Sequence, residues 1–90
     1  MKGGNHVPVI SAFYGLVVRM YFKQSEHNPP HFHVEYGEYQ GIIEIATLNM
    51  IEGNLPLKAR VLIMDWGMQH QNELMEIWTS QNFKKIEPLK

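Results

Sequence analysis

Cysteine is absent from this chain of 90 residues, and so is any apolar run of about 18 residues, the length that a membrane-spanning helix requires. Without cysteine there are no disulfide bonds, thiolate zinc sites, iron–sulfur clusters or cysteine nucleophiles. A surplus of charge is also absent, because 8 Lys and Arg residues nearly balance 9 Asp and Glu residues, for a formal net charge of −1. This balance argues against a protein held to nucleic acid by a strongly basic overall field.

The length of the chain and its first residues indicate a single small domain. The 90 residues leave room for one modest hydrophobic core. Residues 1–7 contain two adjacent glycines and lack the apolar segment of a signal peptide, so we predict a disordered N-terminal extension there. Residues 8–90 are expected to form one α+β domain, and the expected location of the protein is the cytoplasm.

The central part of the chain predicts an antiparallel β-sheet. Residues 16–23 are rich in β-branched and aromatic side chains, and residues 31–36 alternate strictly, as half-buried strands do. Gly37 and Glu38 form the expected two-residue turn into a third strand at residues 39–46. Residues 50–52 predict a short fourth strand, which Gly53 ends.

The last part of the chain predicts a long helix. Residues 57–81 follow helical spacing, and Gly67 marks the place where this helix is expected to break if it is not continuous. Residues 85–89 are expected to form a tail or a final edge strand. The predicted fold is therefore α+β: an antiparallel meander of three or four strands, packed on one face by a long C-terminal helix.

Tight connections fix the register of the predicted sheet, and the register decides which side chains share a face. The two-residue turn predicts the cross-strand pairs His33–Ile42, Glu35–Gln40 and His31–Glu44. A first loop that is symmetric about His27 predicts the pairs Lys23–His31, Tyr21–His33 and Arg19–Glu35. The face under the helix then collects Val18, Met20, Phe22, Phe32, Val34, Tyr36, Ile43 and Ile45. The opposite face collects Arg19, Tyr21, Lys23, His31, His33, Glu35, Ile42 and Glu44.

The predicted helix carries two apolar stripes. The first would pack on the sheet and consists of Ala59, Leu62, Ile63, Trp66, His70, Leu74, Ile77 and Trp78. The second lies on the reverse side and consists of Leu57, Val61, Met64, Met68 and Met75. Two interpretations are open. Either the helix breaks near Gly67 and both stripes are core, or a partner, most simply a second copy in a homodimer, covers the second stripe.

Three of the five histidines lie close together in the sequence and form the candidate functional cluster. The first hypothesis is a metal site made of His27, His31, His33 and Glu35, since two histidines at i and i+2 on a strand can share one ion. Neutral imidazole suits divalent transition metals such as zinc, nickel, copper and iron. The short spacing and the two prolines of the loop weigh against this hypothesis, and the other hypotheses require no cofactor.

The second hypothesis is metal-free cleavage of a phosphodiester, with RNA as the substrate. His31 and His33 would serve as general base and general acid, one deprotonating a ribose hydroxyl and the other protonating the leaving oxygen. Lys23 or Arg19 would stabilise the phosphorane, Tyr21 would stack on a base, and Glu44 lies in the same predicted row. The third hypothesis is that this polar face is only the solvated side of an antiparallel sheet.

His70 is a separate case, because it falls on the stripe that packs against the sheet. We predict a buried, hydrogen-bonded histidine there rather than a ligand, since buried polar groups usually find partners.

Several runs of residues together resemble a known family. They are the segment Pro-Val-Ile-Ser-Ala-Phe-Tyr-Gly at 8–15, the segment His-Asn-Pro-Pro-His-Phe-His-Val-Glu-Tyr-Gly-Glu-Tyr at 27–39 and the segment Glu-Gly-Asn-Leu-Pro at 52–56. Asp65 and Trp66 with His70, Leu74 and Trp78, and a closing Lys-Ile-Glu-Pro-Leu at 85–89, complete the pattern. The chain resembles the bacterial family called domain of unknown function 4160, over about residues 8–89.

This resemblance implies a small cytoplasmic bacterial protein without an established activity. Some members of the family are encoded beside another small domain of unknown function, in arrangements that look like toxin–antitoxin pairs. The resemblance therefore implies a non-enzymatic interaction component of a toxin–antitoxin-like or regulatory module, with a second copy or a co-encoded small protein as partner. The alternative is a small RNA-cleaving nuclease or metal-assisted hydrolase that uses the cluster of His27, His31 and His33.

Overall fold

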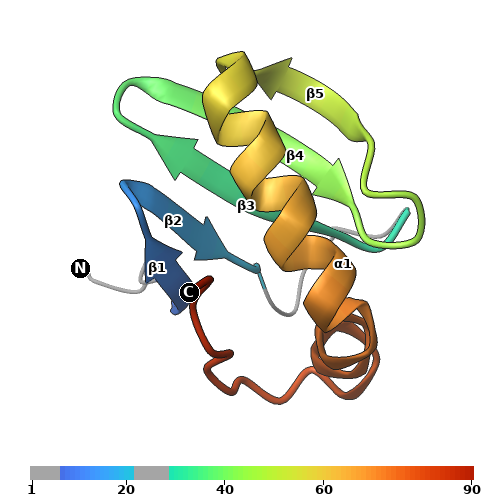
Figure 1. The fold of residues 1–90 in the computed structure, drawn as a ribbon. Helices are drawn as coiled ribbons and strands as arrows, with labels where there is room; N and C mark the ends of the chain where they lie inside the picture. Colours follow the sequence, from blue (N-terminus) through green and yellow to red (C-terminus); the bar gives the residue numbers. More distant parts are fainter. Residues whose placement is uncertain (1–6, 22–28) are drawn as a thin grey trace, which may run out of the picture.

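A computed structural model describes residues 7–21 and 29–90 of the chain and shows an α+β fold (Figure 1). Its elements are β1 (Val9–Phe13), β2 (Leu16–Arg19), β3 (His31–Tyr36), β4 (Tyr39–Glu44), β5 (Met50–Asn54) and α1 (Leu57–Ser80). The strands form one antiparallel sheet in the order β1-β2-β3-β4-β5. The predicted meander with a long C-terminal helix is confirmed, with β1 as an additional strand. The predicted N-terminal extension lies outside the described residues, except for Val7.

Helix α1 crosses one face of the sheet, and the core lies between the two layers (Figure 1). Alternate side chains of the strands point to this face because the side-chain period of a strand is two. Of the eight residues predicted to face the helix, six are buried and Tyr36 is half-buried, whereas Phe22 lies outside the described residues. The buried members of the helix stripe are Ala59, Ile63, Trp66, Leu74 and Ile77.

The register between β3 and β4 is the one that the two-residue turn predicts. His31 pairs with Glu44, His33 with Ile42, and Glu35 with Gln40. The prediction for β2 and β3 is wrong by two residues, because His33 pairs with Arg19 and Glu35 pairs with Val17. Strand β2 ends at Arg19 rather than at residue 23, so the assumption of a connection symmetric about His27 fails. A shift of two residues leaves every side chain on its predicted face.

Helix α1 is kinked, but not at Gly67. The non-helical backbone is at His70, with φ −128° and ψ 20°, and the helix changes direction there (Figure 1). Gly67 is a buried helical residue, and a Cβ atom at this position would come within 2.9 Å of Leu48 Cδ2. Glycine therefore allows the loop between β4 and β5 to approach the helix closely, and the break comes three residues later.

The C-terminal tail runs back along β1 without forming a strand (Figure 1). The Ile86 N–H donates a hydrogen bond to the Ile10 carbonyl at 2.9 Å, and the indole N–H of Trp66 donates to the Glu87 carbonyl at 2.8 Å. These two bonds fasten the tail to both layers of the fold. Across residues 7–21 and 29–90, the one helix is too polar to be a candidate for crossing a membrane.

Candidate functional site

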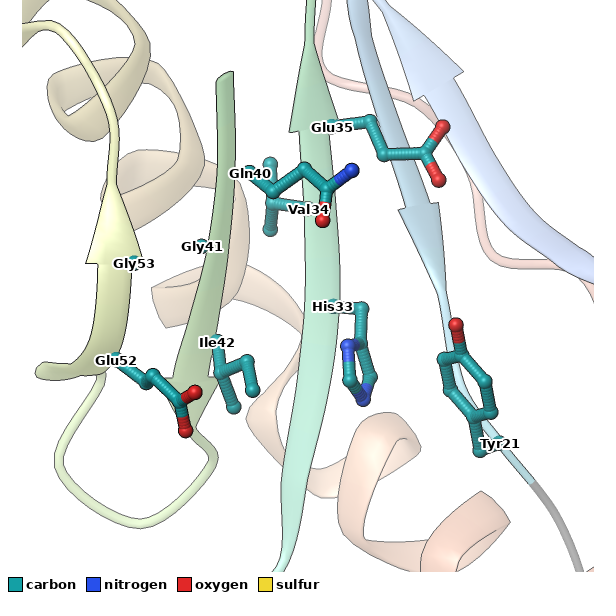
Figure 2. Close-up of a pocket in the computed structure, with 9 residues that line it drawn as sticks. All are labelled: Tyr21, His33, Val34, Glu35, Gln40, Gly41, Ile42, Glu52 and Gly53. Carbon is teal, nitrogen blue, oxygen red and sulfur yellow. The ribbon is translucent and has the colours of Figure 1, made fainter. Parts of the chain in front are cut away.

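The face of the sheet that α1 leaves open carries a cavity of about 230 Å³ (Figure 2). Its lining residues come from β3, β4 and β5 and from the residues that follow β2, and they are Tyr21, His33, Val34, Glu35, Gln40, Gly41, Ile42, Glu52 and Gly53. Pockets for drug-sized ligands are larger, about 300–1,000 Å³. The volume therefore suits a single side-chain head group or a comparably small ligand.

A row of paired residues crosses four strands through this cavity. Arg19 pairs with His33, His33 with Ile42, and Ile42 with Glu52. Neighbouring strands are about 4.8 Å apart, so Glu52 and His33 stand about 10 Å from each other with Ile42 between them. Figure 2 shows the Glu52 side chain extending from β5 toward Ile42 and His33.

Tyr21 and His33 form an aromatic pair at the other side of the cavity. Their ring centroids are 4.3 Å apart and the ring planes are inclined by 52°. Tyr21 lies two residues beyond the end of β2, where its ring stands beside His33 (Figure 2). The sequence predicted that these two residues share a face, and the structure brings their side chains into contact although they are not register partners.

Arg19, the cation that the described residues place on this face, is already paired with a carboxylate. Its Nε donates to Glu35 Oε2 at 3.1 Å, and its Nη1 donates to the Val7 carbonyl at 2.6 Å. The Arg19–Glu35 contact is diagonal because the direct partner of Arg19 is His33. As a result, the Glu35 carboxylate turns toward β2 and away from the centre of the cavity (Figure 2).

His31, unlike His33, is buried and does not line the cavity. Its Nδ1 lies 2.7 Å from the Pro29 carbonyl oxygen, which can only accept, so this nitrogen carries the proton. Its ring lies 5.0 Å from the ring of Trp78 and 5.2 Å from that of His33. The part of α1 beyond the kink thus packs its indole against His31, which aromatic contacts and the hydrogen bond to the Pro29 carbonyl help to hold in place.

Glu44, which the phosphodiester hypothesis includes, takes part in a tight loop. Its Oε1 accepts a hydrogen bond from Thr47 Oγ1 at 2.9 Å, and its carbonyl accepts one from the Leu48 N–H at 2.8 Å. The predicted catalytic set is therefore divided. Tyr21 and His33 meet in the cavity, and His31 lies next to His33 without lining it. Glu44 shapes the loop after β4, and Lys23 lies outside the described residues.

The predicted metal set does not assemble in the described part of the chain. Among residues 7–21 and 29–90, no three His, Asp or Glu side chains come together as a group that could hold a metal ion. Nδ1 of His31 faces the Pro29 carbonyl and the Glu35 carboxylate faces Arg19. His27, the remaining predicted ligand, lies outside the described residues.

Sequence reasoning missed Gln40 and Glu52 as members of the site. The pairing of β4 with β5 shifts between Ile42 and Ile43, and an irregularity of this kind cannot be placed from a pattern of alternation. Gly53 carries the available signal. Its φ is +97°, a conformation that favours glycine, and a glycine inside a strand indicates such an irregularity.

The second apolar stripe of the helix is exposed over most of its length. The exposed fractions are 73% for Leu57, 59% for Val61, 42% for Met64 and 65% for Met68. Met75 differs from these four, because it is half-buried against the core beyond the kink. The interpretation of both stripes as core is therefore wrong for the first four residues and right for Met75.

The prediction for His70 is confirmed in its essentials. The side chain is largely buried, its ring lies 5.3 Å from the ring of Trp66, and its Nδ1 forms a short contact with Glu73 Oε1. His70 therefore stabilises the kinked part of α1 and lies on the opposite side of the sheet from the cavity.

Comparison with known proteins identifies the family but no characterised relative. No curated protein and no solved structure matches the chain. The family model described as a domain of unknown function, DUF4160, matches residues 15–79, which extend from Gly15 before β2 almost to the end of α1. The matched part includes both the cavity on the open face and the exposed stripe of the helix. The chain belongs to the DUF4160 family.

Proposed function

We propose that this chain is a non-enzymatic interaction component of a bacterial, cytoplasmic module of the toxin–antitoxin-like or regulatory kind. It binds a partner helix through the docking stripe, which we define as Leu57, Val61, Met64 and Met68. The observation that carries this proposal is the exposure of all four side chains on one side of α1. Contiguous exposed apolar surface of this kind marks interaction sites, and methionine suits surfaces that adapt to a partner.

The spacing of the docking stripe favours a helix as the partner. Its residues follow each other at intervals of four, three and four, the alternation with which helices interlock along a narrow seam. A flat or irregular partner would not require this periodicity. Leucine and valine at one end of the stripe and two methionines at the other provide side chains that fit between those of an opposing helix.

The charges beside the stripe favour a second copy of the same helix. In an antiparallel pair, Leu57 of one copy lies opposite Met68 of the other, and Val61 lies opposite Met64. Lys58 of each copy then faces Asp65 of the other along one flank of the seam, which gives two symmetric ion pairs. Both side chains are exposed in the single chain, where Asp65 Oδ1 accepts a hydrogen bond from Gln69 Nε2 at 3.3 Å. A co-encoded small protein with one amphipathic helix is the second partner that the stripe accepts.

The experiment that tests this function is co-expression with the protein encoded beside the gene. We expect the tagged neighbour to retain the wild-type chain and to release the Met68→Glu variant, because a carboxylate in the seam must be desolvated. Growth of cells that express each protein alone should differ from growth with both. The matched control is Asn72→Glu, which adds the same charge one turn beyond the stripe. Retention of Met68→Glu at the wild-type level, together with equal growth in all cultures, contradicts the proposal.

A small RNA-cleaving nuclease is the alternative function, and the contact between Tyr21 and His33 in the cavity is the observation that favours it. His31 is buried and its Nδ1 donates a hydrogen bond to the Pro29 carbonyl, which weighs against a mechanism that uses two histidines. Incubation of the wild-type chain and of His33→Ala with single-stranded RNA separates the two functions. Cleavage by the wild-type chain that His33→Ala abolishes establishes the nuclease. Equal absence of cleavage in both supports the interaction component.

A further inference from the structure

We propose that the cavity on the open face binds a guanidinium group, such as that of an arginine side chain, between Glu52 and the aromatic pair of Tyr21 and His33. This site is independent of the docking stripe, because the two lie on opposite sides of the sheet and share no residue. Its chemistry follows from the charges, the spacing and the size of the cavity.

The charges of the open face select a cation. Within the described residues this face carries the carboxylates of Glu35, Glu44 and Glu52 against the single cation of Arg19. Arg19 is paired with Glu35, and Glu44 accepts a hydrogen bond from Thr47. Neither Glu44 nor Glu52 is paired with a cation among the described residues, and of these two only Glu52 lines the cavity. An anionic ligand, a phosphate or an RNA backbone included, would be repelled here, whereas a cation gains an ion pair with Glu52.

The spacing of the cavity selects a flat group. Glu52 and His33 stand about 10 Å apart across two strands, and the side chain of Ile42 forms an apolar floor between them. A guanidinium above Ile42 can place its N–H edge on the Glu52 carboxylate while its opposite side meets the rings of His33 and Tyr21. Gln40, at the upper side of the cavity, offers its amide oxygen as a further acceptor (Figure 2).

A guanidinium fits this arrangement better than an ammonium group does. It is planar, it donates through several N–H groups in one plane, and it is weakly hydrated, so it both stacks on aromatic rings and pairs with a carboxylate. An ammonium is a compact and strongly hydrated charge that gains less from an apolar floor. The cavity of about 230 Å³ is large enough for one such head group.

The test titrates the full chain with blocked arginine, N-acetyl-L-arginine N-methylamide. Two-dimensional ¹⁵N NMR monitors the binding. We expect saturable shifts at Gly53, Ile42 and Tyr21. The corresponding citrulline derivative, which has the same shape without the charge, should not produce them. Free L-arginine forms the second arm. Blocked arginine that binds as tightly as free arginine shows that the guanidinium is recognised without a free backbone, as a side chain in a protein would present it, and binding of free arginine alone indicates a small molecule.

Two substitutions locate the binding site. Glu52→Gln should weaken the binding of blocked arginine about fivefold, the effect of losing one ion pair at about 4 Å in water. The matched control Glu76→Gln removes an exposed carboxylate from α1 and should leave binding unchanged. Tyr21→Leu should weaken binding about two- to fivefold, whereas Tyr21→Phe keeps the aromatic face and the affinity.

Three results would overturn the proposal: no saturable shift with either form of arginine, equal binding of the citrulline derivative, or equal affinities of the wild type and Glu52→Gln. None of them affects the docking stripe, since retention by a protein partner depends on α1. Conversely, a chain that binds no partner through α1 can still bind arginine at Glu52, so the two proposals fail separately.

Discussion

The two faces of this small domain differ in how they are built. The docking stripe comes from a single helix, is apolar, and projects outward along consecutive turns of α1. The cavity is lined by residues in or beside four strands, and polar side chains contribute to its rim. A surface on one element depends on local spacing, whereas a cavity across several strands depends on register. We therefore expect the proposed docking stripe to tolerate changes in the sheet and the proposed arginine site not to tolerate them.

A substitution that destabilises the core should disrupt the docking stripe and the cavity together, and it should have the largest effect on stability. Trp66 is fully buried, contacts the rings of Phe13 and Phe32, and donates its indole N–H to the Glu87 carbonyl. We expect Trp66→Ala to lower the free energy of unfolding by about 3–5 kcal/mol, through the cavity that it leaves. Urea denaturation followed by circular dichroism measures this loss. Phe83→Ala, at an exposed position of the tail, is the control and should change stability little.

Gly53→Ala should separate the two faces. A Cβ atom at Gly53 would lie 2.3 Å from the Gln40 carbonyl oxygen, and φ at this position is +97°. We expect a loss of about 1–3 kcal/mol in stability, displacement of Glu52 and loss of arginine binding, with the docking stripe unchanged. Gly37→Ala is the matched control, because φ there is +60° but nothing lies within 4 Å of the new atom. If Gly53→Ala binds arginine like the wild type, the dependence of the cavity on β5 is refuted.

Reversing the charges beside the docking stripe should weaken the homodimer and leave the cavity unchanged. Lys58→Asp and Asp65→Lys each place like charges opposite one another in the antiparallel pair. Each should raise the dissociation constant of the homodimer at least about tenfold. The double variant restores opposite charges and should return the constant close to that of the wild type. Sedimentation equilibrium measures all four proteins, and a double variant as weak as the single ones would contradict the antiparallel arrangement.

The smallest effect is expected at the ion pair beside the cavity. Arg19→Met removes the part-exposed ion pair with Glu35 and the hydrogen bond to the Val7 carbonyl, and it should cost about 1 kcal/mol of stability. The same change releases the Glu35 carboxylate and makes the open face more negative. Arginine should then bind more tightly to Arg19→Met than to the wild type, in the NMR titration described above. Weaker binding would show that Arg19 supports the cavity rather than competing for its carboxylates.

Local rules were sufficient for much of the fold. The turn at Gly37 and Glu38 fixed every predicted pair between β3 and β4, and helical spacing separated the buried stripe of α1 from the exposed one. The faces of β2 were also predicted correctly, although its register was not. A register error of two residues leaves the alternation of faces unchanged. Tyr21 and His33 are therefore correctly predicted to share a face, although they are not the cross-strand pair that the sequence predicts.

Long-range contacts account for what the sequence did not reveal. The kink lies at His70 rather than at Gly67. Gly67 remains helical, and its lack of a side chain lets Leu48 pack closely against the helix. Met75 lies beyond that kink and packs on the core although it continues the spacing of the docking stripe. Glu52 joins the cavity through the irregular pairing of β4 with β5. Each of these outcomes depends on a contact between segments that are distant in sequence.

The most direct test of the docking stripe is the mass of the chain in solution, alone and mixed with the co-encoded protein. Sedimentation equilibrium of the wild type should give twice the 10.5 kDa of one chain, and the folded Met68→Glu variant should give 10.5 kDa and bind no partner. The Asn72→Glu control should behave like the wild type. A wild-type chain that stays at 10.5 kDa both alone and in the mixture would contradict the assignment of the stripe as a protein-binding surface.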